Sequence, residues 1–257
     1  MSGFQQTGWQ LFDHDSAVAD WVNAARPAAI ATTTDPEHAH WLRCQGTWFA
    51  GVNVLGNDAT GAVDGSGPLR GAAVDFALGL MDEIPNWDRA QISVTYPGYP
   101  KQENETDAAF GFRLRRDAAH VDGLSRTGPN NRRHLKEPHA FVLGLPMTET
   151  GPGASPMVVW EGSHVIMGDA FGAALKDTPP AEWPNVDLTE IYQAARKRCF
   201  DTCKRVEIHA RPGQAYVIHR LALHGVAPWQ PGAVVPPAGR MIAYFRPHLT
   251  QIDQWLS

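Results

Sequence analysis

The stretch Ala118-Ala119-His120-Val121-Asp122-Gly123 decides the fold that we predict for this chain. Side chains alternate across an extended strand, so His120 and Asp122 would point to the same side. An imidazole nitrogen together with a carboxylate oxygen suits iron, manganese or zinc. One further histidine would complete a two-histidine, one-carboxylate set that leaves coordination positions open. We therefore predict a metal site built on His120 and Asp122.

This pair alone is weak, because 11 His and 27 acidic residues in 257 produce a His-x-acid pair about once by chance. Support comes from the segments that follow. A predicted strand ends in the turn Gly162-Ser163-His164, and another leads to His224-Gly225. We predict His224 as the third ligand. Its competitor His219 lies five residues earlier, on the opposite strand face, and has no glycine after it.

The composition favours strands and loops over a helical bundle, because 24 Gly and 20 Pro are many turn formers. Short predicted strands at turn-punctuated spacing, with appended helices, indicate a mainly β jelly-roll barrel. We expect one domain over residues 1–257, in which a helical and loop region, 1–89, packs on a barrel core, 90–257.

Four segments carry specific expectations. Asp15 or Ser16 should cap a helix that ends at Pro27, and a second helix should run from Leu69 to Ile84. Phe110–Arg116 alternates apolar and charged residues, so it predicts a half-buried strand leading into His120. Ser125–Pro138 reads as an irregular, basic loop. The remaining strands and helices are expected at 45–56, 90–96, 139–147, 156–160, 168–176, 188–204, 205–210, 214–219, 223–228 and 240–247.

The charge and the cysteines limit the partners and the compartment. A formal net charge of -5 and a pI of about 6.1 provide no global basic field for nucleic acid or an anionic membrane. We expect no membrane span and no signal peptide. Three cysteines do not support a disulfide framework, and Cys199 and Cys203 are interpreted as two semi-buried thiols. A reducing cytoplasm is the expected compartment. His38-x-His40 lies in a loop-like segment and is interpreted as solvated.

Taken in order, His120-x-Asp122, Gly162-Ser163-His164, His224-Gly225 and Arg240 form a pattern over about residues 110–247. This pattern resembles the iron(II)/2-oxoglutarate dioxygenases, specifically their phytanoyl-CoA dioxygenase-like branch. The resemblance implies a double-stranded β-helix. It also implies Fe(II) on His120, Asp122 and His224, and 2-oxoglutarate with its far carboxylate on Arg240. His164 would shape the barrel and would not bind metal. Halogenating relatives have Gly or Ala at the carboxylate position, so Asp122 favours hydroxylation with molecular oxygen.

The chain departs from this family at two points. Val226 stands two residues after the distal histidine, where the family often has a Ser or Thr hydroxyl that helps to hold the cosubstrate. The loop before Arg240 is long and proline-rich. Arg246 lies on the same predicted strand at the same parity, and it is the alternative anchor for 2-oxoglutarate.

Two other functions fit a jelly roll. One is a cupin-type metalloenzyme that does not use 2-oxoglutarate, and the other is a non-catalytic binding protein. The substrate is expected to be a small molecule. Basic residues directly follow the metal pair, so an anionic substrate group could bind there: Arg126, Arg132, Arg133, His134 and Lys136. The sequence indicates no oligomeric state.

Overall fold

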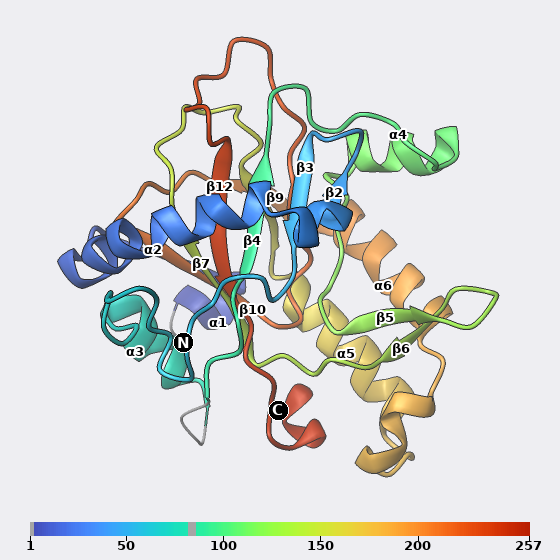
Figure 1. Cartoon of the computed structure of the whole chain (residues 1–257). Helices are drawn as coiled ribbons and strands as arrows, with labels where there is room; N and C mark the ends of the chain where they lie inside the picture. Colours follow the sequence, from blue (N-terminus) through green and yellow to red (C-terminus); the bar gives the residue numbers. More distant parts are fainter. Residues whose placement is uncertain (1–2, 82–85) are drawn as a thin grey trace.

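Two antiparallel sheets form the centre of the protein in a computed structural model that describes residues 3–81 and 86–257 (Figure 1). The larger sheet has the order β1 (Trp9–Phe12), β10 (Ala215–His219), β7 (Phe141–Pro146), β12 (Arg240–Phe245), β4 (Gln91–Thr95), β3 (Trp48–Gly51) and β2 (Leu42–Arg43). The smaller sheet is β11 (His224–Val226), β8 (Met157–Glu161) and β9 (Lys204–Ile208), and a separate hairpin pairs β5 (Leu124–Thr127) with β6 (Arg132–Leu135). The mainly β class with appended helices is thus confirmed.

The strand β12 separates two apolar cores because its side chains alternate between the faces of the large sheet. Met241, Ala243 and Phe245 join the core that contains the buried face of α2 (Ser16–Thr34). Ile242 and Tyr244 point the other way. They pack with side chains from both sheets, so the two sheets lie face to face across a shared interior, as in a jelly roll.

Helices cover the outside of this sandwich. Figure 1 shows α2 crossing the strands of the large sheet, and α5 (Ser163–Leu175) and α6 (Thr189–Thr202) packing together beside the hairpin. The other helices are α1 (Gly3–Thr7), α3 (Ala72–Leu78), α4 (Asp107–Arg115) and the short 3-10 helices η1 (Pro36–Trp41), η2 (Pro180–Asn185) and η3 (Ile252–Trp255). No helix in the part of the chain that the structure describes is long and apolar enough to cross a membrane.

The helix α2 confirms one expectation and corrects another. The Asp15 carboxylate accepts a hydrogen bond from the Ala17 amide at 2.8 Å and caps the helix as predicted. The prediction that Pro27 ends the helix is wrong, because α2 continues to Thr34. Pro27 lies on the exposed side, and Ala29 beyond it is fully buried. Core packing of the next turn therefore outweighs the backbone hydrogen bond that proline cannot make.

Three further expectations need correction. Phe110–Arg116 is not a strand but most of α4, because Thr106 caps a helix there by accepting from the Ala109 amide and Asp107 stands in the first turn. The basic segment 125–138 is not irregular, since it contains most of β5 and β6. The helix predicted over 69–84 is shorter, at Ala72–Leu78, and residues 82–84 of that prediction lie outside the described residues.

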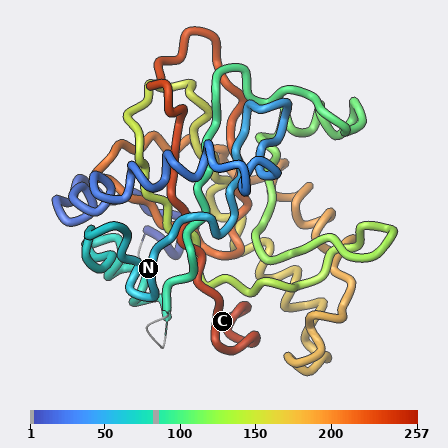
Figure 2. Tube along the Cα trace, viewed as in Figure 1, coloured from blue at the N-terminus to red at the C-terminus, as the bar shows by residue number. Residues whose placement is uncertain are grey.

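The N-terminal region contributes strands as well as helices. β1 pairs with β10, while β3 pairs with β4 and carries β2, so residues before 90 extend both sides of the large sheet. Figure 2 shows the chain between β11 and β12 leaving the sheets as a long loop at the top of the view. The single-domain organisation stays a prediction.

Candidate metal centre

His120, Asp122 and His224 lie together at one end of the sandwich interior. Their possible ligand atoms are all within 4.8 Å of one another, and this is the only such group of three in the described part of the chain. The Asp122 Oδ1 atom is 3.3 Å from His120 Nε2 and 3.8 Å from His224 Nε2. The structure therefore brings together the three side chains that the sequence predicts as ligands; their role in binding iron stays a prediction.

Backbone pairing brings the two histidines together. His120 and His224 form an isolated antiparallel bridge, with amide-to-carbonyl distances of 2.8 and 3.0 Å in the two directions. Each Nδ1 is also held by a carbonyl, that of Ala118 at 3.1 Å and that of Ala222 at 2.9 Å. If both Nδ1 atoms donate a proton, both Nε2 atoms present a lone pair towards Asp122, which is the tautomer that a metal ligand needs.

The surroundings of the triad favour an ionised Asp122 and a neutral His224, which are the forms of these side chains that bind a metal. Burial opposes ionisation of Asp122, but Arg246, His120 and His224 together hold the pKa of its carboxyl well below the usual range. The Arg246 Nη1 atom lies 3.2 Å from Asp122 Oδ2, which leaves Oδ1 for the histidine side. Burial lowers the pKa of His224 to about 4, so this ring is neutral at pH 7.

The glycine after His224 has a steric reason. A Cβ at Gly225 would lie 2.2 Å from the Asp117 carbonyl oxygen, which accepts a hydrogen bond from the Val226 amide. Asp117 and Ala118 both have positive φ, at 54° and 53°. Arg205 donates two hydrogen bonds to the buried Asp117 carboxylate, at 2.8 and 2.9 Å. The turn that leads into His120 is thus held both by the backbone carbonyl and by the side chain of Asp117. No pattern in the sequence predicted the Asp117–Arg205 pair.

The triad opens into a cavity of about 310 Å³, here called the metal cavity. It is lined by the triad, by Arg246 and Val226, and by aromatic and apolar side chains that include Trp41, Trp48, Met157 and Tyr244. The pattern of three ligand atoms beside open space could accommodate a metal with free coordination positions and a small molecule next to it.

Arg240 lies further along the interior face of β12. It is 5% exposed, it lines a second cavity of about 250 Å³ with Tyr216, and its Nη1 atom has no hydrogen-bond partner among the described residues. Directly across the ladder is Thr95, whose buried hydroxyl is also without a partner there. A buried guanidinium without a carboxylate is costly. Two neighbouring side chains with unused hydrogen-bond donors fit an anion, and no pattern in the sequence indicated Thr95.

Other histidines lie away from the triad. His164, interpreted as structural, is buried at the start of α5, where its Nε2 is 3.2 Å from the Gln5 carbonyl oxygen. His219 packs against it with 4.8 Å between ring centroids. His38 and His40 lie on η1 and are not buried, and His40 Nδ1 is 2.9 Å from the Glu37 carbonyl oxygen. None of them belongs to the metal group.

Comparison with known proteins gives structural similarity without sequence similarity. No family model and no curated protein sequence matches the chain. Among solved structures, the chain is similar to EctD from S. alaskensis with bound Fe, at a TM-score of 0.47 and 14% identity over 97% of this chain and 77% of that one. It is also similar to EctD from S. alaskensis with 2-oxoglutarate and 5-hydroxyectoine, at a TM-score of 0.45 and 15% identity over 97% and 76%.

A third similar structure is SnoK, a non-heme alpha ketoglutarate dependent carbocyclase from nogalamycin biosynthesis. Its TM-score is 0.47 and its identity 13%, over 98% of this chain and 88% of that one. The phytanoyl-CoA dioxygenase-like branch stays a prediction, and the activity of this chain has to be argued from its own residues.

Proposed function

We propose that the chain is a non-haem iron oxygenase that uses 2-oxoglutarate and molecular oxygen to hydroxylate a C–H bond of a small molecule. The observation that carries this proposal is the convergence of His120, Asp122 and His224 beside a cavity. The donor set fits Fe(II), because two neutral imidazoles and one carboxylate leave coordination positions open. When bound, iron with 2-oxoglutarate and oxygen would supply the oxidising power for the reaction.

The protein would contribute position and charge. The bridge between His120 and His224 sets the separation of the two imidazoles, and Arg246 orients the Asp122 carboxylate. Since His224 is already neutral and Asp122 already ionised at pH 7, metal would bind there without displacing protons from these two groups. Apolar walls such as Met157 and Val226 would limit water around the metal.

Arg240 and Thr95 are the proposed anchor for the far carboxylate of 2-oxoglutarate. Both have unmet donors, and the planar guanidinium suits bidentate binding of a carboxylate. A Thr95 hydroxyl would also supply the hydroxyl that Val226 lacks. Arg246, the alternative anchor, is already engaged with Asp122. This assignment requires the cosubstrate to lie along the interior face of β12, past Tyr244 and Ile242.

The substrate would reach the metal from a larger cavity that shares Trp48, His120, Asp122 and Val226 with the metal cavity. Because Arg126 and Arg133 line this larger cavity, an anionic substrate is expected. Hydroxylation rather than halogenation follows from Asp122, and the low cysteine count keeps a reducing cytoplasm as the expected compartment.

The activity can be tested without knowing the substrate. Purified protein with Fe(II), ascorbate and 2-oxoglutarate should release succinate slowly in air, and the variant His120→Ala should not. Absence of succinate from the wild type, or an equal rate in His120→Ala, would overturn the oxygenase proposal and favour a metalloenzyme of the cupin type or a binding protein.

The anchor needs its own test. Anaerobic titration of the Fe(II) protein with 2-oxoglutarate should give about tenfold weaker binding in Arg240→Gln, because a charge-assisted hydrogen bond is lost. Thr95→Val, which keeps the shape and removes the hydroxyl, should weaken binding less. Unchanged affinity in Arg240→Gln would remove Arg240 from the site and leave the metal assignment intact.

A further inference from the structure

The hairpin of β5 and β6 places two arginines directly opposite each other. Arg126 pairs with Arg133 in the ladder, so both side chains lie on the same face. Like charges at directly opposed positions destabilise a strand pair. The chain keeps this arrangement beside the candidate metal centre, where Gly123 and Leu124 lead from Asp122 into β5.

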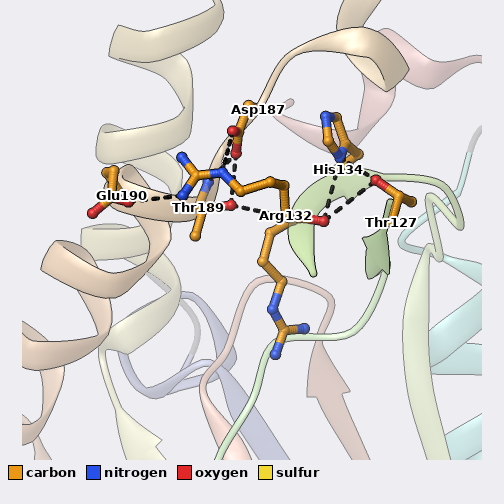
Figure 3. A network of polar contacts seen from close by, with 7 residues as sticks. Thr127, Arg132, His134, Asp187, Thr189 and Glu190 are labelled. Atoms are coloured by element: carbon orange, nitrogen blue, oxygen red, sulfur yellow. Dashed lines mark hydrogen bonds and ion pairs between the residues drawn. The ribbon is translucent and has the colours of Figure 1, made fainter. Parts of the chain in front are cut away.

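The other basic residues of the hairpin have partners of their own. Arg132, on the opposite face, donates to Asp187 at 2.5 Å and to Glu190 at 3.0 Å (Figure 3). His134 Nδ1 lies 2.6 Å from the Thr127 hydroxyl, and Lys136 donates to the Pro184 carbonyl at 2.8 Å. Three of the five basic residues predicted as a possible anion site are therefore already engaged: Arg132 and Lys136 hold the hairpin against α6 and the segment before it, and His134 contacts the other strand of the hairpin.

Arg126 and Arg133 differ from these three. Within residues 3–81 and 86–257, no carboxylate forms an ion pair with either of them. Arg126 is exposed, whereas Arg133 is partly buried, donates to the Leu124 carbonyl at 2.8 Å and stacks on Tyr192. Burial lowers the pKa of Arg133, and the positive charges of Arg126 and Arg196 lower it further.

Both arginines line a cavity of about 480 Å³ that reaches His120 and Asp122, here called the arginine cavity. Most of its other charged groups are paired. Arg113 pairs with Glu105 at 3.2 Å, Asp117 with Arg205 at 2.8 Å, and Asp122 with Arg246 at 3.2 Å. Glu137, whose side chain is 55% exposed, has only His139 at 3.9 Å. The two opposed arginines therefore leave the cavity with an excess of positive charge.

We infer that Arg126 and Arg133 bind the anionic group, a carboxylate or a phosphate, of the small molecule that is oxidised at the metal. Two guanidinium groups on one strand face can hold such a group from both sides, and its negative charge would relieve their repulsion. The cavity then directs the rest of the molecule towards His120 and Asp122. The identification of this anion as a substrate rests on the proposed oxygenase function, whereas the anion site itself does not.

Inorganic phosphate and acetate are suitable probes for isothermal titration of the full chain at constant ionic strength. Arg126→Gln should weaken binding of the preferred anion about tenfold. Arg132→Gln removes the same charge from the opposite face of the same hairpin, and its affinity should stay within twofold of the wild type. Preference for phosphate would indicate a phosphate ester, and preference for acetate a carboxylic acid. Equal weakening in both variants, or none in Arg126→Gln, would overturn the inference.

Arg126→Glu gives a sharper test, because it replaces a repulsive cross-strand pair with an attractive one. Its melting temperature should equal or exceed that of the wild type, while anion binding should be lost. This combination excludes misfolding as the cause of lost binding. Retained binding in Arg126→Glu would contradict the site.

Succinate release separates the two proposals. If anionic compounds stimulate succinate release more than their neutral amide or alcohol analogues, and Arg126→Gln raises KM about tenfold with kcat within twofold, both proposals are supported. Equal stimulation by neutral analogues would overturn the substrate inference while the oxygenase stands. Arg126-dependent phosphate binding without any succinate would overturn the oxygenase and leave an anion site.

Discussion

Among the described residues, two of the three close pairs of histidine rings have almost the same geometry and different chemical surroundings. The rings of His120 and His224 are 4.7 Å apart at 53°, and those of His164 and His219 are 4.8 Å apart at 47°. Only the first pair has a carboxylate between its Nε2 atoms, that of Asp122. Proximity of two imidazoles therefore does not by itself make a metal site.

The second pair also uses its nitrogens differently. His219 Nδ1 accepts a hydrogen bond from the Leu221 amide at 3.1 Å, and His164 Nε2 is turned to the Gln5 carbonyl. A Cβ at Gly8 would lie 2.5 Å from His164 Nδ1, so this nitrogen faces backbone. Both pairs line a cavity, of about 510 Å³ for His164 and His219 and about 310 Å³ for the triad. What distinguishes the triad is a carboxylate on which the two Nε2 atoms converge.

The largest expected effect comes from removing the carboxylate. Asp122→Ala should weaken Fe(II) or Co(II) binding at least about 100-fold, since loss of an outer partner of a ligand alone costs 10- to 100-fold. Succinate release should disappear with it. Metal titration of the full chain, followed by the absorption of Co(II), measures this directly.

The matched control is the other histidine pair. His164→Gln and His219→Gln should leave Co(II) affinity within about twofold of the wild type, because neither ring contacts the triad. A large loss of Co(II) affinity in either control, or undiminished Co(II) binding in Asp122→Ala, would contradict the assignment of metal binding to the triad.

Gly225 gives the next effect. Gly225→Ala places a Cβ 2.2 Å from the Asp117 carbonyl, so the backbone bridge between His120 and His224 must shift. We expect a loss of about 2 to 3 kcal/mol in the free energy of unfolding together with weaker metal binding. Gly172→Ala in α5, where nothing lies within 4 Å, should instead stabilise the protein by about 0.5 to 1 kcal/mol. Denaturant titration of both variants tests the contrast.

The sequence predicts which three side chains come together because metal chemistry restricts residue types and strand alternation restricts their spacing; that they bind a metal stays a prediction. His120, Asp122 and His224 could be selected from order and chemistry, and the following glycine was a real signal with a steric cause. Arg246 was recognised by its parity with Arg240, but its contact with Asp122 depends on how the end of β12 meets the segment after α4. No local sequence pattern encodes a contact between two such distant segments.

The errors in the fold have the same origin. The alternation in Phe110–Arg116 fitted a strand, and only the Thr106 cap distinguishes the helix that forms. The hairpin was missed because, of the residues in its strands, only Leu124 and Leu135 are apolar and buried. Its other face is stabilised by Asp187 and Glu190, more than 50 residues away. Local propensity cannot reveal a hairpin that is held by distant charges.

Acidification should lower the free energy of unfolding through the buried His219 of the second histidine pair. Burial lowers the pKa of His219 to about 3, below the ordinary histidine value of about 6.5. Between these values the unfolded chain binds more protons, so the free energy of unfolding falls as the pH falls from 6.5 towards 3. At pH 5 this one group should cost about 2 kcal/mol relative to pH 7. His219→Gln should show a smaller decrease in stability between pH 7 and pH 5, and an identical decrease would contradict the assignment.

The smallest effect concerns Arg246, the arginine that contacts the carboxylate of the triad. Arg246→Gln removes the group that holds Asp122 Oδ2 at 3.2 Å, so the carboxylate should become less well oriented and metal affinity should fall about tenfold. Arg240→Gln, on the same strand face, should leave metal affinity unchanged and weaken only 2-oxoglutarate. If Arg246→Gln lost 2-oxoglutarate while keeping Co(II) affinity, Arg246 would be the anchor. The guanidinium beside Asp122 would then serve the cosubstrate and not the ligand.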